Sequence, residues 1–207
     1  MQPSAPHSPA RTGARETYGR VALAVFLILF GAAMTLVDHA WNITPMGAIA
    51  LFAGAYLLNR PLAVFVPIAA LVISDLAKTL FDPYWGFDRS TLLVMAFKYL
   101  GFVGIALCGQ LVRRERAPVA AYVGSLAGAA LGGAVVFFLV SNFGCWLTPL
   151  FGYERSMDGL LQCYGLALPF FRAMLVGDLI YVPLLFGVFA LAERTVPALA
   201  PVRAIGR

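Results

Sequence analysis

Charged side chains are scarce in this sequence. Only 12% of its 207 residues are Asp, Glu, Lys or Arg, whereas 61% are hydrophobic, and the mean hydropathy is +0.84. A soluble domain carries about a quarter charged residues, because its surface must face water. The shortage of charge therefore excludes an ordinary soluble protein and predicts a surface that faces lipid.

Motifs for metal binding and catalysis are also missing. The three cysteines form no C-x-x-C pair, and the two histidines, His7 and His39, lie far apart, which disfavours a zinc site. The sequence has no G-x-S-x-G, H-E-x-x-H or Walker A motif. We therefore expect no enzyme activity, no metal and no cofactor. An ATP-driven role would need a separate ATPase.

The net charge of +5 does not indicate a nucleic-acid partner. Most basic residues lie in short segments between apolar runs rather than on one polar face, which is the pattern of membrane topology. If the N-terminus is cytoplasmic, ten of the fifteen Lys and Arg residues fall in short inner segments. The positive-inside rule then predicts that both termini are cytoplasmic.

Six apolar runs approach the length of a membrane-spanning helix, which is roughly 20 residues. They cover residues 20–37, 44–58, 61–80, 91–112, 118–140 and 168–191. We therefore predict an all-α, polytopic membrane protein with a bundle of about six transmembrane helices over residues 20–192. We expect a disordered cytoplasmic tail at 1–19, a long outer loop at 141–167 with a short interfacial helix at 157–166, and a cytoplasmic tail at 193–207.

Apart from Arg20 at the inner boundary of the first run, five charged residues lie within these predicted helices. Asp75, Lys78, Lys98 and Arg172 fall in the outer half of the membrane, and Asp178 falls near its middle. A charge at the centre of a membrane helix costs about 2.5–3.5 kcal/mol, so it should face a polar cavity or another charge. Because the inner half-helices carry no charge, the pattern favours a pocket open to the outside over a continuous pore. Ion pairs that only tie helices together are the alternative.

Polar and aromatic residues of the predicted outer loops are candidates for shaping or closing such a pocket. They are His39, Trp41, Asn42, Tyr84, Trp85, Asn142 and Trp146. Indole and imidazole rings offer a ligand both stacking faces and hydrogen bonds. The same residues also fit ordinary loops at a membrane interface. Cys145 and Cys163 could pair in an oxidising compartment, which their spacing alone does not decide.

Two of the predicted helices carry a face of small residues. Glycines recur at Gly124, Gly128 and Gly132 in the fifth helix, and the second helix has a similar face that includes Gly47 and Gly54. Small residues at this spacing let another backbone approach closely. Each face serves either packing within the bundle or contact with a partner protein.

Several stretches of the chain, taken together, resemble a known group of proteins. They are His39-Ala-Trp41-Asn42-Ile-Thr44-Pro45, Ile73-Ser74-Asp75, Ser141-Asn142-Phe143-Gly144, Cys163-Tyr164, Leu168-Pro169 and Gly177-Asp178. This combination resembles an uncharacterised family of bacterial six-helix membrane proteins, which is similar to the substrate-binding (S) components of energy-coupling-factor (ECF) vitamin transporters.

The resemblance implies a multi-pass protein of the bacterial cytoplasmic (inner) membrane with its substrate site on the outer side. It also implies two cytoplasmic ATPases and a membrane coupling subunit as partners, contacted through small residues on the early helices. Candidates for that contact are Ala22, Ala24, Gly31 and Ala32.

The expected function is therefore binding of a small hydrophilic, vitamin-like nutrient for uptake. All five charged residues above are expected to anchor this nutrient: Asp75, Lys78, Lys98, Arg172 and Asp178. A non-transporting membrane scaffold or assembly subunit, which would dock through the fifth helix, is the main alternative. A membrane enzyme that uses Asp75 or His39 as a base is a third reading, and no motif supports it.

Overall fold

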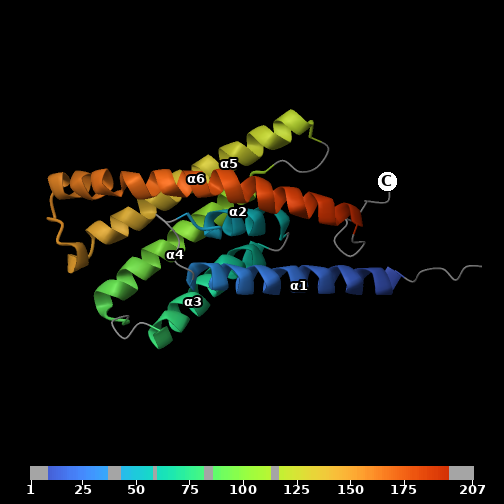
Figure 1. Cartoon of the computed structure of the whole chain (residues 1–207), viewed down its shortest axis with the longest axis horizontal. Coiled ribbons are helices and arrows are strands. Elements are labelled where there is room, and N and C mark those ends of the chain that lie inside the picture. The colour runs from blue at the N-terminus through green and yellow to red at the C-terminus, as the bar shows by residue number, and fades with distance from the viewer. Residues whose placement is uncertain (1–8, 37–42, 58–59, 82–85, 113–116, 196–207) are drawn as a thin grey trace, which may run out of the picture.

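Helices make up most of the part of the chain that the computed structural model describes, which is residues 9–36, 43–57, 60–81, 86–112 and 117–195 (Figure 1). The helices are α1 (Pro9–Leu36), α2 (Met46–Tyr56), α3 (Arg60–Phe81), α4 (Arg89–Gly109), α5 (Val119–Trp146) and α6 (Met157–Thr195), with a short 3-10 turn, η2 (Pro149–Phe151). No strand occurs among the described residues, which confirms the all-α prediction.

Four helices are long and apolar enough to cross a membrane. The matching segments are Pro61–Leu80, Arg89–Gly109, Val119–Trp146 and Met157–Thr195. Their outer faces expose large apolar side chains such as Leu80, Leu131 and Leu179. Exposed apolar surface on this scale marks contact with a membrane or with other proteins.

The short helix α2 lies at the centre of the bundle and contacts all five other helices. Its residues from Met46 to Gly54 are all buried. With 11 residues it is about 17 Å long, roughly half the thickness of the hydrocarbon core. The second predicted span is therefore too long, because apolar composition does not distinguish a membrane span from a short helix enclosed by protein.

Glycines allow α2 to approach its neighbour α4 closely. A Cβ atom at Gly54 would overlap the carbonyl oxygen of Ala106, and a Cβ atom at Gly109 would overlap the carbonyl oxygen of Leu51. Two backbones in direct contact leave no room for a side chain at either position. For Gly54, the predicted small-residue face of the second helix thus serves packing within the bundle.

Aromatic rings fix the other side of α2 against α6. The ring of Phe52 lies 5.2 Å from that of Phe186 and 4.9 Å from that of Phe189, both edge to face. Tyr56 stacks on Phe52 with a centroid distance of 4.4 Å. Aromatic pairs in these arrangements contribute about 0.5–1.5 kcal/mol each beyond their buried area.

Several predicted boundaries differ from the structure. The first helix begins at Pro9, inside the segment 1–19 that was expected to be disordered, because residues 10–20 contain Ala, Arg and Glu, which favour helices. The last helix begins at Met157 and continues through Pro169, so the interfacial helix and the sixth span form one element. Proline is tolerated there because neighbouring groups in a membrane bundle can satisfy the freed backbone carbonyl.

The helices alternate in direction along the long axis of the molecule. Figure 1 shows the start of α1 and the end of α6 at the same end. The opposite end, which we call the distal end, holds the last residues of α1, α3 and α5 and the first residues of α4 and α6. At this end Asp88 caps α4, with Oδ1 accepting from the backbone N–H of Ser90 at 2.7 Å. Hydrogen bonds from the Thr91 hydroxyl and from the Ser90 and Thr91 backbone hold the pKa of Asp88 below its usual value.

Candidate functional site

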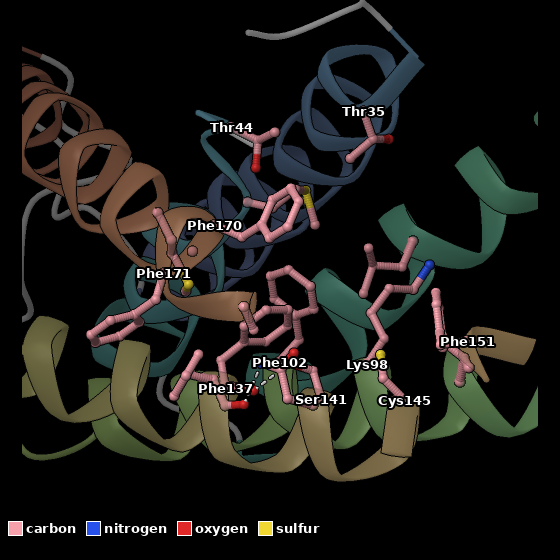
Figure 2. A pocket seen from close by; sticks show the side chains of 18 of the residues that line it. Thr35, Thr44, Lys98, Phe102, Phe137, Ser141, Cys145, Phe151, Phe170 and Phe171 are labelled. Carbon is pink, nitrogen blue, oxygen red and sulfur yellow. Dashed lines mark hydrogen bonds between the residues drawn. The ribbon is translucent and has the colours of Figure 1, made fainter. Parts of the chain in front are cut away.

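A cavity of about 760 Å³ opens among the helices toward the distal end (Figure 2). The second half of α3, the end of α5, the first turn of α2 and the first half of α6 contribute to its walls, together with residues 94–102 of α4 and the end of α1. Its volume falls within the range of small-molecule sites, about 300–1,000 Å³. The polar lining residues are Thr35, Thr44, Ser74, Asp75, Lys78, Lys98, Ser141, Asn142 and Tyr153.

The carboxylate of Asp75 organises the charged part of this cavity. Its side chain is only 1% exposed. Lys98 Nζ donates to Oδ2 at 2.6 Å, and the Tyr99 hydroxyl donates to the same oxygen at 2.8 Å. Lys78, one helical turn after Asp75, donates to Oδ1 at 3.4 Å. A carboxylate this deeply buried is tolerated only when it is paired and hydrogen-bonded in this way.

The two lysines connect the buried carboxylate to the open part of the cavity. The side chain of Lys98 is 24% exposed and that of Lys78 is 32% exposed. An ammonium group has three donor hydrogens, and Lys98 uses one of them on Asp75. Lys98 can therefore donate to an acceptor atom of a ligand without giving up its ion pair.

Six phenylalanines contribute to the remaining wall of the cavity. They are Phe102, Phe137, Phe138, Phe151, Phe170 and Phe171. Phe102 and Phe137 pack with a centroid distance of 4.8 Å, as do Phe138 and Phe171. Figure 2 labels Phe102, Phe137, Phe151, Phe170 and Phe171 among the side chains that line the same cavity as Lys98. The cavity thus combines a charged hydrogen-bonding corner with flat apolar walls.

The segment between α5 and α6 folds over one side of the cavity. Trp146 Nε1 donates to the carbonyl oxygen of Glu154 at 2.8 Å, and the Arg155 guanidinium lies 5.6 Å from the centre of the Trp146 ring. Gly152 makes the turn with φ +70°, a conformation that favours glycine. Phe151 and Tyr153, on either side of it, line the cavity. Burial, followed by the nearby Cys163 and Cys145, raises the pKa of the Tyr153 phenol, which stays a neutral hydrogen-bonding group at neutral pH.

A protein-family model matches residues 15–199, nearly the whole of the chain and all of the cavity. The chain belongs to DUF6580, a family of unknown function. Comparison with curated proteins and with solved structures gives no match. Membership of DUF6580 therefore indicates no substrate or activity. What the site of this DUF6580 chain can bind has to be inferred from the residues that line it.

Four of the predicted site residues line the cavity of this DUF6580 chain. They are Asp75, Lys78, Lys98 and Asn142. Asp75 and Lys98, 23 positions apart in the sequence, form a direct ion pair. The Nδ2 group of Asn142 donates to the carbonyl oxygen of Phe138 within the same helix, at 2.8 Å.

Three other predicted residues do not line it. Trp146 holds the following loop instead, as described above. Arg172 is exposed on α6. Asp178 lies half-buried where α6 meets α2. A Cβ atom added at Gly47 would lie only 2.7 Å from the Oδ1 atom of Asp178. His39, Trp41, Asn42, Tyr84 and Trp85 lie outside the residues that the structure describes.

The expected docking face on the early helices is largely internal in DUF6580. Ala24, Gly31 and Ala32 are buried, and only Ala22 of the four candidates is exposed. A Cβ atom at Gly31 would lie 3.1 Å from Met46 Sδ and 3.2 Å from Ala70 Cβ. These small residues pack α1 onto α2 and α3, so that they offer no surface to a partner.

Sequence reasoning missed Tyr99 and the phenylalanines. Tyr99 follows the singled-out Lys98 directly, and on a helix adjacent residues point in different directions, so its contact with Asp75 had no sequence signal. The doublets Phe137-Phe138 and Phe170-Phe171 look like ordinary lipid-facing residues of apolar helices. Only the packing distinguishes the rings that face the cavity.

Proposed function

We propose that this protein binds a small nutrient in the distal cavity and takes part in its uptake across the membrane. The single observation that carries the proposal is the buried Asp75 carboxylate, which holds Lys98 in position at the edge of a cavity of about 760 Å³. Charged groups inside a membrane bundle are costly, and they usually mark a substrate or ion pathway.

The distribution of basic residues supports an outward orientation of the cavity. Along the sequence, ten of the fifteen Lys and Arg residues lie in the first half of α1, at the start of α3, between α4 and α5, or at and beyond the end of α6. The start of α1 and the end of α6 lie at the end of the bundle opposite the distal end. The positive-inside rule assigns that end to the cytoplasm. The distal cavity then faces the outside, and both termini are cytoplasmic in the bacterial inner membrane.

The cavity chemistry favours a vitamin-like ligand with a planar ring and hydrogen-bond acceptors. Phenylalanine walls such as Phe137 and Phe171 suit a flat ring, and Lys98 suits a carbonyl or carboxylate oxygen. This combination agrees with the resemblance to ECF S components. In that reading an ECF-type coupling subunit and ATPases drive transport, and the small residues of α1 are not their contact.

The test is to purify the protein in mild detergent and identify co-bound small molecules by mass spectrometry. Lys98→Gln should lose the bound compound or weaken it by about tenfold or more, because a hydrogen bond to a charged group contributes about 1.5–3 kcal/mol. Arg172→Gln, a change to an exposed basic residue outside the cavity, is the matched control and should bind normally. An empty wild-type protein, or equal retention by both variants, would overturn the proposal.

A scaffold function is the second candidate, and the open glycine face of α5 favours it. Cβ atoms at Gly124, Gly128 and Gly132 would meet nothing within 4 Å outside their own helix. These glycines border a groove of about 410 Å³ between α4 and α5, of the kind that admits a transmembrane helix of a partner protein. The scaffold reading expects Gly128→Leu to abolish a stable heteromeric complex while Lys98→Gln leaves it intact. The nutrient-binding reading expects Lys98→Gln to lose the bound ligand while Gly128→Leu retains it.

A further inference from the structure

Two of the three cysteines line the same cavity from different helices. Cys145 lies in the last turn of α5, and Cys163 lies in the second turn of α6. Figure 2 shows Cys145 on the cavity wall, with Lys98 and Phe151 drawn beside it. The third cysteine, Cys108, belongs to α4 and borders the separate groove beside α5. All three are free thiols in the structure.

The contacts of Cys163 bring it close to Cys145. Cys163 Sγ donates to the backbone carbonyl oxygen of Asn142 at 3.4 Å. Asn142 and Cys145 are three positions apart on α5, so they occupy neighbouring positions on one helix face.

Their different exposure assigns them different roles toward a water-soluble reagent. Cys163 is buried, with 1% of its surface exposed, whereas Cys145 is partly exposed. A reagent that enters the cavity therefore reaches Cys145 first. Cys163, which lines the same cavity, is then the nearby thiol that can attack what has formed there.

We propose that Cys145 and Cys163 form a dithiol site that a low-molecular-weight disulfide converts into a disulfide between α5 and α6. The Cys145 thiolate attacks the reagent disulfide, forms a mixed disulfide and releases one thiol. Cys163 then attacks the Cys145 sulfur, a second reagent thiol leaves with the Cys163 proton, and the protein disulfide is complete. One reagent disulfide is reduced to two thiols, and the two cysteines are oxidised.

The link joins the two helices at the wall of the cavity. Asn142, one turn before Cys145, and Leu166, one turn after Cys163, are both lining residues. The oxidised protein thus has a fixed spacing between α5 and α6 at the position where a ligand would touch them. The site itself stands on the cysteine geometry and is independent of the identity of any ligand.

The test uses the purified full-length protein in detergent micelles with oxidised glutathione as the reagent. After incubation, free thiols are alkylated, and the intact mass and the modified peptides are determined. We expect two thiols to be lost per chain, an internal link between the peptides of Cys145 and Cys163, and full alkylation of Cys108. Cys108→Ser should leave the reaction unchanged, whereas Cys163→Ser should stop at a glutathione adduct on Cys145.

Two results would overturn the site. One is a wild-type protein that keeps the glutathione adduct on Cys145 or keeps all three thiols. The other is the same pattern of links, including links to Cys108, in protein unfolded with dodecyl sulfate, because the pairing would then not depend on the fold. Neither readout involves nutrient binding. Failure of the glutathione experiment therefore leaves the proposed nutrient binding untouched, and failure of the nutrient-binding test leaves the dithiol site untouched.

Discussion

The glycines at the contact between α2 and α4 and the glycines of α5 lie in opposite environments in the structure. Gly54 and Gly109 lie where the backbones of α2 and α4 touch, so that neither position has room for a methyl group. Gly124, Gly128 and Gly132 face open space. A small-residue pattern therefore indicates that close approach is allowed, and it does not say whether the approaching helix belongs to the same chain.

The contrast is sharpest at two adjacent residues. Gly132 has no neighbour within 4 Å outside its own helix, whereas a Cβ atom at Gly133 would lie 3.2 Å from Ile105 Cγ2 and 3.4 Å from Ile105 Cα. Successive residues on a helix point about 100° apart, so that one glycine faces α4 and the next faces the open groove. A single substitution, glycine to alanine, can then probe both environments with the same chemical change.

Gly54→Ala should have the largest effect of this series. The added methyl group meets backbone atoms of Ala106, which cannot rotate away as a side chain can. We expect the free energy of unfolding to fall by about 1–3 kcal/mol or more, despite a gain in helix propensity of about 1 kcal/mol. Unfolding in mixed detergent micelles, followed by circular dichroism, measures the change. Wild-type stability would contradict the close crossing of α2 and α4.

Gly133→Ala should have an intermediate effect. Its methyl group requires Ile105 to move by a few tenths of an ångström, and the side chain of Ile105 can partly adjust. Strain and improved helix propensity then nearly cancel, and we expect a loss of less than about 1 kcal/mol in the same assay. A loss as large as that of Gly54→Ala would mean that α4 and α5 pack as tightly as α2 and α4.

Gly128→Ala should have the smallest effect and the opposite sign. Nothing surrounds the added methyl group, so only the helix propensity changes. We expect unchanged stability or a gain of up to about 1 kcal/mol for the isolated protein. Destabilisation in purified protein would show that the groove beside α5 is filled by this chain or by a second copy of it, which a measurement of oligomeric state would then separate.

Much of the architecture could be predicted from the sequence because it depends on apolar composition. The predicted runs 61–80, 91–112, 118–140 and 168–191 overlap the four long apolar helical segments, Pro61–Leu80, Arg89–Gly109, Val119–Trp146 and Met157–Thr195. The error lies in α2, whose 11 residues are apolar because they are enclosed by other helices. Composition reports an apolar environment and does not separate lipid from protein.

The sequence analysis identified charged residues of the site and did not identify which of them form ion pairs. Asp75 and Lys98 were singled out because a charge in an apolar helix needs a compensating partner. Which of the five charges pair depends on how the helices are rotated and how deep each lies, so that Arg172 and Asp178 fell outside the cavity. The prediction put Cys145 and Cys163 in one loop, whereas in the structure they belong to two helices, α5 and α6, and both line the cavity.

The shortness of α2 also sets how far a molecule in the cavity has already travelled. Met46 and Gly47, the first residues of this helix, line the cavity, so the cavity lies directly in front of the N-terminal end of α2. Under the uptake proposal, a solute in the cavity still has to pass α2, a helix of about 17 Å, which is roughly half the thickness of a 30 Å hydrocarbon layer. The proposal therefore places the conformational change needed for uptake around α2.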